Sequence, residues 1–481
     1  MGNPASFFFI KTTNQKSTNF SKSFSHYHEM IARSVILFTH RGSQNMKTNS
    51  VSTLKPEDLD MEHLEKYDVL TLIRARRSVL LNDSLRKQID NNLKERNCIK
   101  DLLELEQVEH DAEIQNIIGL CYSNGFCGVQ EDKKIAFDWF KKSADQEYAV
   151  AQFNLGICYY NGNGCEEDDN KAFEWYMKSA EQGYANAQNN LGVCYENGYG
   201  CEKDEKKAFE LYKKAAEQGH ATAQNNLARC YDLGRGCKKD DYKYFEWCKK
   251  SAEQGNAEGQ YNLGICYKIG YGCEENKRQA LKWITKSAEQ DYEEAQNDLI
   301  ACYFFGWICK KDRYKAFEWC KRAAENGYVF SQRRLANFYK NGIGCKKDKQ
   351  KAFEWYKKAA EQGKEEDQYY LAVHYLQGDS CEKDEKQAFK WCKKAAKQGN
   401  VNAQSLLGIC YKLGVGCETN EKKAFVWFRK SALQGDKIAQ YFLTVCYEKD
   451  EKKVFEWYKQ VDEYEDEDAT QWLINRVMHQ K

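Results

Sequence analysis

A single stretch of sequence recurs along most of this chain at a constant spacing. Its copies share the frame A-x-A-Q-x-x-L-G-x-C-Y, then a glycine loop, then K-A-F-x-W-Y-x-K-A-A-E-Q-G. About ten copies cover residues 112–461. We number them from repeat 1, which begins at Ala112, to repeat 10, which lacks six residues of the loop. Such a period is typical of arrays in which each unit packs only against its neighbours. Repeats 2 to 10 begin 36 residues apart, at Ala149, Ala185, Ala221, Ala257, Glu293, Val329, Glu365, Val401 and Lys437.

The spacing of apolar residues predicts two helices in every copy. In repeat 3, Ala187, Leu191 and Cys194 fall on one face of a helix. The glycines of "ENGYGC" then allow a turn, Asp204 is placed to N-cap a second helix, and Gly219 is placed to end it. No useful stretch alternates apolar and polar residues as a half-buried strand does. We therefore expect an all-α fold, an αα-hairpin superhelical solenoid with helical caps.

Residues outside the repeats differ from them in composition. Residues 1–50 are rich in Ser, Asn, Thr and Lys, and we expect a disordered N-terminal tail there. Residues 51–111 contain two helical patterns without the repeat frame, which predicts an N-terminal cap. Residues 462–481 begin with the acidic run "DEYEDED" and end in a pattern that predicts a closing helix.

The charge balance and the motifs exclude several classes of protein. Lys and Arg number 73 against 72 Asp and Glu, which gives none of the basic excess of nucleic-acid-binding proteins. No apolar run approaches the length of about 20 residues that spans a bilayer. No phosphate-binding loop, dinucleotide fingerprint, catalytic triad motif or metal signature stands in a fitting context. We expect no catalysis, no cofactor and no metal site.

The repeated unit resembles the Sel1-like repeat, a relative of the tetratricopeptide repeat. The resemblance rests on the whole frame, from A-x-A-Q through G-x-G-C to K-A-A-E-Q-G, and it recurs in all ten copies. It implies an αα solenoid that acts as an adaptor between proteins. The family pattern has no shared catalytic residues, so it implies an architecture and a binding role without naming the partner.

Cysteine and tryptophan recur at fixed places in the frame. Cys194 and Cys201 illustrate a pair spaced seven residues apart, but Phe338 and His374 replace the first member in repeats 7 and 8. A disulfide framework tolerates such orphaned thiols poorly, whereas a packing position accepts Phe, so we expect core packing and no disulfide. We expect the tryptophans of the second helices in the core as well: Trp139, Trp175, Trp247, Trp283, Trp319, Trp355, Trp391, Trp427 and Trp457.

Positions that the frame leaves free to vary are candidates for partner binding. On a helical wheel, the residue after the frame Gln and the residue after the frame Tyr point away from the core of the first helix. Exposed aromatic residues are favoured anchors at protein interfaces, although neighbouring helices could instead cover these positions. The predicted groove of the first helices has the aromatic members Phe153, Tyr160, Tyr261, Phe304, Tyr369 and Tyr441.

A row of asparagines adds a second candidate for the same groove. Asn154, Asn190, Asn226 and Asn262 recur once per repeat. An Asn amide matches the hydrogen-bonding groups of a peptide backbone, and a repeat step of about 9 Å is close to three extended residues. The competing interpretation is that each Asn bonds to the neighbouring helix pair.

These observations predict a non-catalytic, cytoplasmic scaffold that binds a protein or peptide partner in the groove of its first helices. A different interpretation comes from the start "MGNPAS", which fits the pattern for N-myristoylation of Gly2. With Lys11, Lys16 and Lys22 as a second, electrostatic signal, the protein would be a membrane-recruited subunit that activates a partner enzyme. The same residues also resemble, faintly, a mitochondrial transit peptide.

Substitution of Gly2 distinguishes the two interpretations. If Gly2 is acylated, Gly2→Ala moves the protein from the membrane fraction to the supernatant, because the acyl chain is one of the two signals that hold it. Cell fractionation with immunoblotting measures this shift. An unchanged distribution between the fractions would contradict membrane recruitment through Gly2 and would favour the scaffold interpretation.

Overall fold

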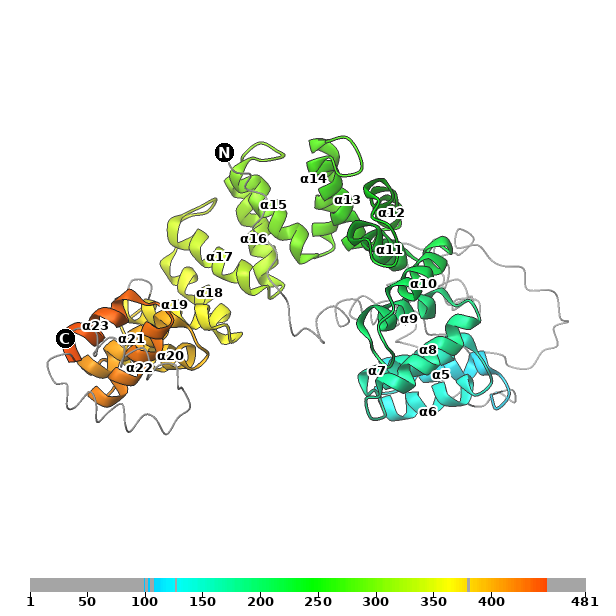
Figure 1. The fold of residues 1–481 in the computed structure, drawn as a ribbon, viewed down its shortest axis with the longest axis horizontal. Helices are drawn as coiled ribbons and strands as arrows, with labels where there is room; N and C mark the ends of the chain where they lie inside the picture. The colour runs from blue at the N-terminus through cyan, green and yellow to red at the C-terminus, as the bar shows by residue number, and fades with distance from the viewer. Residues whose placement is uncertain (1–98, 100–102, 104–107, 126–127, 379–380, 448–481) are drawn as a thin grey trace, which may run out of the picture. The chain divides into compact units, whose positions relative to one another are not determined.

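The computed structural model describes residues 99, 103, 108–125, 128–378 and 381–447 (Figure 1). Among these residues the regular structure is α-helical throughout, and no strand is present, which confirms the predicted fold class. The predicted tail at 1–50, most of the predicted cap at 51–111, the end of repeat 10 and the closing segment at 462–481 lie outside the described residues.

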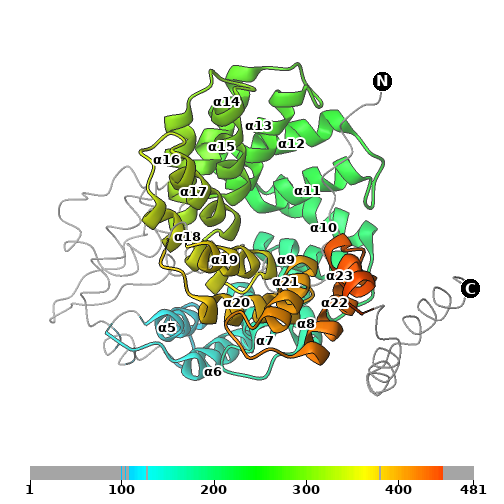
Figure 2. The same cartoon turned by 90° about the vertical axis from the view of Figure 1, so that its left-hand side faces the viewer.

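The chain divides into two compact units, residues 1–247 and 248–481. Figure 1 and Figure 2 show the helices of each unit as consecutive hairpins. The helices of the first unit are α5 (Ala112–Asn124), α6 (Lys133–Ala144), α7 (Ala149–Asn161), α8 (Asp169–Glu181), α9 (Ala185–Asn197), α10 (Glu205–Glu217) and α11 (Ala221–Leu233). The boundary falls within α12 (Asp241–Glu253). The helices of the second unit are α13 (Ala257–Ile269), α14 (Lys277–Glu289), α15 (Glu293–Phe305), α16 (Arg313–Glu325), α17 (Val329–Asn341), α18 (Lys349–Glu361), α19 (Glu365–Gln377), α20 (Glu385–Lys397), α21 (Val401–Leu413), α22 (Glu421–Leu433) and α23 (Lys437–Tyr447).

Helix boundaries follow the signals in the frame. Every first helix from α7 to α23 begins at the predicted repeat start. The Asp204 carboxylate accepts a hydrogen bond from the Lys207 backbone N–H at 3.0 Å, as expected of an N-cap. Gly219 adopts a φ of 88°, in the left-handed region where glycine carries no steric penalty, and its N–H reaches the Ala216 carbonyl.

A buried glutamine in each first helix ties one repeat to the next. In repeat 3, the Nε2 of Gln188 donates to the Ala180 carbonyl, at the end of the preceding repeat's second helix. Its Oε1 accepts from the Nε2 of Gln218, at the end of its own second helix, at 2.8 Å. The Gln188 side chain is buried, so these bonds satisfy polar groups that water does not reach. The same glutamine pair recurs at 146–115, 182–152, 290–260, 362–332, 398–368 and 434–404.

Aromatic rings fill the space between successive repeats. The frame Phe of one second helix packs edge-to-face against the frame Tyr of the next first helix, as Phe173 does against Tyr195, with ring centroids 5.3 Å apart. Such pairs contribute about 0.5–1.5 kcal/mol beyond the area they bury. The pairing recurs at 137–159 and 209–231 in the first unit, and at 317–339, 353–375 and 389–411 in the second.

The second glycine of the G-x-G loop allows the closest approach between repeats. A Cβ atom on Gly200 or Gly344 would overlap the carbonyl oxygen of Asp169 or Arg313, the first residue of the preceding second helix. Both glycines also have positive φ values, 66° and 70°. Any other residue at this position therefore forces the loop away from the preceding repeat.

The first cysteine of each pair lies in the core and the second closes a helix end. Cys158, Cys194 and Cys230 are buried, and burial raises the pKa of the Cys230 thiol to about 12. Cys165 is half-buried, and its thiol lies 3.5 Å from the carbonyl of Cys158, seven residues earlier, which it caps as a weak donor. The same thiol-to-carbonyl contact occurs where Phe or His replaces the first cysteine, at 345–338 and 381–374. The 18 cysteines whose side chains the structure describes are free thiols.

The tryptophan row is less buried than the sequence predicts. Of its described members only Trp391 is buried, with 8% of its surface exposed, and the others are half-buried. A lysine three residues later covers the open ring face, as Lys178 does at 4.0 Å from the centre of the Trp175 ring. The predicted core position is confirmed for Trp391, whereas Trp247, Trp319, Trp355 and Trp427 pack against the core from its edge.

Burial of His220 makes the stability of the first unit depend on pH. Its Nδ1 accepts a hydrogen bond from the Ala223 N–H, and burial lowers the pKa of His220 to about 4, against about 6.5 when unfolded. Because the folded-state pKa is the lower one, the unfolded chain binds more protons between these values, and the stabilisation is lost as the pH falls below about 6.5. Asn256 and Asn400 make the same cap without a titrating group.

When the pH is lowered from 7 to 5, we expect the unfolding free energy of the wild type to fall by about 1–2 kcal/mol more than that of the His220→Asn variant. Urea unfolding followed by circular dichroism at both pH values measures the difference. Equal losses in the two proteins would show that folding does not shift the pKa of His220.

Candidate functional site

The structure separates the predicted aromatic groove residues into three classes. Phe153 is 1% exposed and packs against Tyr176 and Tyr184, so its predicted exposure is wrong. Tyr441 is 60% exposed. The remaining members, Tyr160, Tyr261, Phe304 and Tyr369, are half-buried.

In other repeats, too, the residue after the frame Gln is less exposed than the helical wheel predicts. Asn189, Asn225 and Ser405 occupy it in other repeats and are all buried. The helical wheel of an isolated helix fails here because each first helix is covered by the second helices of two repeats. These positions therefore do not form one continuous exposed row.

The asparagine row makes hydrogen bonds between repeats. The Nδ2 of Asn154 donates to Asn116 Oδ1 at 2.8 Å, and the Nδ2 of Asn226 donates to Asn189 Oδ1 at 3.0 Å. Asn190 accepts from its neighbour Asn189, and Asn262 is half-buried. The contacts of Asn154 and Asn226 fit the competing, structural interpretation, and peptide binding by the row stays a prediction.

The most exposed cluster of large aromatic side chains lies at the C-terminal end of α15, in repeat 6. Phe305 and Trp307 are 57% and 54% exposed, and their rings stack with centroids 4.9 Å apart and an interplanar angle of 11°. Phe304 packs against Phe305 and stacks on the buried Phe338 of repeat 7. We call Phe304, Phe305 and Trp307 the aromatic platform. The sequence prediction contained Phe304 but missed the two more exposed members.

A departure from the frame creates this platform. Repeat 6 reads "FFGWIC" where the frame has G-x-G-C, so Ile308 replaces the second glycine. Gly306 keeps its cap conformation, with φ 82°, whereas Ile308 is partly buried against the core of the second unit. Trp307, between them, is exposed. In the sequence, this platform could have been recognised from two consecutive Phe residues followed by a loop that lacks its second glycine.

An ion pair lies beside the platform. The Lys268 ammonium, at the end of α13, bonds both carboxylate oxygens of Asp298 on α15 at 2.8 and 2.9 Å, and only 20% and 14% of these side chains are exposed. The ammonium also lies 5.8 Å from the centre of the Trp307 ring. Ile269, the next residue, is 62% exposed. The pair thus joins repeat 5 to repeat 6 and holds a charge against one ring of the platform.

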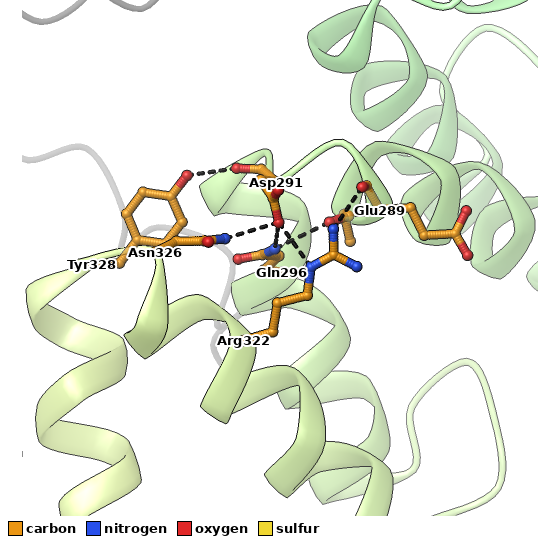
Figure 3. Close-up of polar contacts among 7 residues, drawn as sticks. Glu289, Asp291, Gln296, Arg322, Asn326 and Tyr328 are labelled. Atoms are coloured by element: carbon orange, nitrogen blue, oxygen red, sulfur yellow. Dashed lines mark hydrogen bonds and ion pairs between the residues drawn. The ribbon is translucent and has the colours of Figure 1, made fainter. Parts of the chain in front are cut away.

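The N-terminal end of α15 carries a second departure from the frame, shown in Figure 3. Asp291 replaces the usual glycine and adopts a φ of 61°, which costs a non-glycine residue about 1–2 kcal/mol. Its Oδ1 accepts from Arg322 Nε at 2.8 Å, Asn326 Nδ2 at 2.8 Å and Gln296 Nε2 at 2.9 Å. Burial acts to raise the pKa of Asp291, but the bonds from Arg322 and Asn326 outweigh it and lower the pKa.

The glutamine pair of the frame is broken at the same place. Asn326 replaces the second glutamine and is one methylene shorter, so it donates to Asp291 instead of Gln296. The Oε1 of Gln296 is buried without a hydrogen-bond partner. The chain therefore departs from the frame at both ends of α15, with one strained backbone position at the end of repeat 5 and one unsatisfied acceptor in repeat 6.

Within the described residues no group of three or more His, Cys, Asp or Glu is placed to hold a metal ion. None of the described helices is both long and apolar enough to cross a membrane.

Comparisons with known proteins agree with this architecture. The Sel1 repeat profile matches nine stretches of the chain: 112–148, 149–184, 185–220, 221–256, 257–292, 294–328, 329–364, 366–400 and 401–436. The last match ends before α23 begins. A Sel1 repeat protein from Oxalobacter formigenes is 30% identical, with a TM-score of 0.50 over 64% of this chain and 90% of that one. The protective antigen c5321 of uropathogenic Escherichia coli, which displays an SLR fold, is 29% identical, with a TM-score of 0.41 over 76% of this chain and 93% of that one. A comparison with curated proteins gave no match.

Restoring the frame at both departures is expected to stabilise the second unit. In Asp291→Gly with Asn326→Gln, the glycine removes the backbone strain and the glutamine can bond the Oε1 of Gln296. The lost Arg322–Asp291 pair is exposed and contributes at most about 1 kcal/mol. We expect a net gain of about 1–2 kcal/mol in unfolding free energy, measured by urea unfolding. A loss of stability would identify the Asp291 network as a stabilising device instead.

Proposed function

This chain belongs to the Sel1 repeat family, and we propose that it is a scaffold that binds a peptide or helix of a partner protein at the aromatic platform of repeat 6. Sel1 repeats are protein–protein interaction modules, and the family is generally non-catalytic. The proposal narrows that role to one surface. Within the predicted groove, it keeps Phe304 and adds Phe305 and Trp307.

The exposed Phe305–Trp307 stack is the observation that carries the proposal. Moving a large aromatic side chain from water into a protein interface is energetically favourable, and an exposed ring has not yet gained this energy. The two rings order each other by stacking at 4.9 Å, so a partner that covers them has less side-chain entropy to remove. Buried aromatic anchors dominate the energy of most protein interfaces.

The surroundings of the stack fit a protein interface. Ile269 extends the apolar surface, and Lys268 and Asp298 form a polar, already paired edge. An interface of this kind has an apolar centre and a polar rim. The Phe304–Phe338 stack anchors the platform to repeat 7, which gives the anchors a rigid base.

The frame provides a matched control for the test. Leu413 and Val415 of repeat 9 occupy the frame positions of Phe305 and Trp307, and Leu413 is 67% exposed. The test variant is Phe305→Ser with Trp307→Ser, and the control variant is Leu413→Ser with Val415→Ser. Both remove two apolar side chains that flank a helix-ending glycine, although Val415 is half-buried where Trp307 is exposed.

We expect the platform variant to lose at least tenfold in partner affinity, as removal of two central anchors does, while the control variant binds as wild type. Tagged chains purified from their own cells after mild cross-linking identify the partner, and titration with that partner measures the affinity. Equal binding by all three proteins would place the function elsewhere on the array. Circular dichroism establishes that the variants fold.

The second interpretation, a myristoylated subunit recruited to a membrane, depends on Gly2. This residue lies outside the described residues, and no feature of the repeats favours that interpretation. It stays a prediction of the sequence.

A further inference from the structure

Arg334 holds a frame position that ties one repeat to the preceding one. In repeat 4 this position is Asn226, whose Nδ2 donates to Asn189 of repeat 3 at 3.0 Å. In repeat 6 it is Asp298, whose carboxylate is bonded by Lys268 of repeat 5 at 2.8 and 2.9 Å. In both cases a side chain of the preceding repeat satisfies the residue at this position.

Repeat 6 gives Arg334 no such partner. Phe304 holds the frame position of Lys268, and its side chain has no polar atom. Asn297 holds the frame position of the asparagine acceptor, but its Oδ1 accepts a hydrogen bond from Ser331 at 3.3 Å. Within the part of the chain that the structure describes, no residue accepts a hydrogen bond from the Arg334 guanidinium or forms an ion pair with it.

Arg334 is half-buried beside the aromatic platform. It lies four residues before Phe338 on α17, and residues with this spacing share one face of a helix. Phe338 in turn stacks on Phe304 of the platform, with ring centroids 5.9 Å apart. Burial raises the pKa of the Cys320 thiol to about 12, and the positive charge of Arg334 opposes this rise, so the guanidinium also lies near α16. An unmatched positive charge therefore stands next to the exposed rings.

The surrounding repeat strengthens this charge. Residues 329–364, which form repeat 7, contain ten Lys and Arg against three Asp and Glu, a net charge of +7. Repeat 6 has six of each, and repeat 8 has six against seven. Two carboxylates of repeat 8 reach repeat 7, but both pair with Arg333: Glu366 at 2.7 Å and Asp367 at 3.0 Å. These carboxylates therefore leave the charge of Arg334 unmatched.

We propose that the partner segment bound at the platform is acidic: an Asp or Glu side chain of the partner pairs with Arg334, and a neighbouring large apolar side chain covers the Phe305–Trp307 stack. The inference rests on the proposed function and names the chemistry of its partner. A guanidinium can bond both oxygens of a carboxylate, which fixes the position of the segment as well as holding it. The charge of repeat 7 attracts such a segment and repels a basic one.

The extent of the positive charge favours a short acidic segment over a nucleic acid. The chain as a whole has a net charge of only +1, so the excess of repeat 7 is local. Nucleic-acid-binding proteins carry a basic excess along the whole surface that follows the phosphates. A protein segment needs only one carboxylate and one apolar side chain at the right spacing.

Selection from a phage-displayed library of random dodecapeptides tests this chemistry before the partner is known. The baits are the full wild-type chain, the Phe305→Ser, Trp307→Ser variant and the Arg334→Gln variant. Arg334→Gln removes the charge without breaking an ion pair of the described fold. The matched control is Arg278→Gln on α14, because Arg278 is exposed and also forms no ion pair with a described residue. Circular dichroism establishes that each bait is folded.

We expect the peptides enriched on wild type to carry Asp or Glu within a few residues of Trp, Phe or Leu. On Arg334→Gln the acidic enrichment should disappear while the apolar enrichment persists, and Arg278→Gln should select the same peptides as wild type. Apolar peptides without acidic residues, or an acidic preference that survives Arg334→Gln, would overturn the proposal.

Titration of one selected peptide measures the contribution of Arg334. Arg334→Gln should weaken binding at least tenfold, and Arg334→Lys should retain part of the affinity, because an ammonium keeps the charge but not the two-pronged geometry. The affinity of wild type should also fall more steeply with added sodium chloride than that of Arg334→Gln. In a charge swap, Arg334→Glu should bind the peptide with Lys in place of its acidic residue more tightly than wild type does. Equal affinities of wild type and Arg334→Gln would refute the pairing.

The same selections separate this inference from the proposed function. If the enriched peptides require Phe305 and Trp307 but contain no acidic residue, the platform function stands and the acidic partner is refuted. If acidic peptides require Arg334 but bind equally without the two rings, the proposed function fails at the platform. Single-stranded DNA that competes with every selected peptide and requires Arg334 would show that the surface takes nucleic acid, which also overturns the proposal.

Discussion

A buried amide sets the register of this array. The frame glutamine of each first helix has a donor and an acceptor that water cannot reach, and both must be satisfied within the protein. In repeat 3, Gln188 satisfies them with one bond to the preceding repeat and one to its own second helix. A slip of one residue would leave both groups unpaired. The edge-to-face pairs such as Phe173–Tyr195 then pack in the register that the amides impose.

Because the same few contacts recur, a departure from the frame has a visible energetic cost. The chain around α15 carries a strained Asp291 at the end of repeat 5, and an unsatisfied Gln296 oxygen and two exposed aromatic rings in repeat 6. Strain and unsatisfied groups also occur elsewhere, because Glu147 has the same positive φ and Asn116 and Ser405 each have a buried side-chain atom without a hydrogen-bond partner. The exposed Phe305–Trp307 stack, rather than the strain, therefore distinguishes repeat 6 from the rest of the array.

The sequence predicted the helices well because their signals are local. Apolar spacing, the Asp204 cap and the Gly219 terminus each depend on residues within one turn of the helix. Exposure was harder to predict, because it depends on which neighbouring helices cover a position. Phe153 looked exposed on a wheel drawn for one helix, yet it packs against Tyr176 and against Tyr184, the last residue of its own repeat. The spacing of the cysteines was visible, but its reason, a thiol that caps a helix carbonyl, required atomic positions.

The platform lies where one loop residue departs from the frame. In the loops of repeats 2, 3, 4, 7 and 9 the second glycine lies against the preceding repeat so closely that a Cβ atom would overlap a carbonyl oxygen, as at Gly344. Ile308 has that Cβ, so its loop cannot repeat the approach, and its side chain packs into the local core instead. Trp307 is then presented outward against Phe305. Phe305 stands at a frame position that is exposed in repeats 2 to 9, so its exposure reflects a large ring at an exposed position rather than the change in the loop.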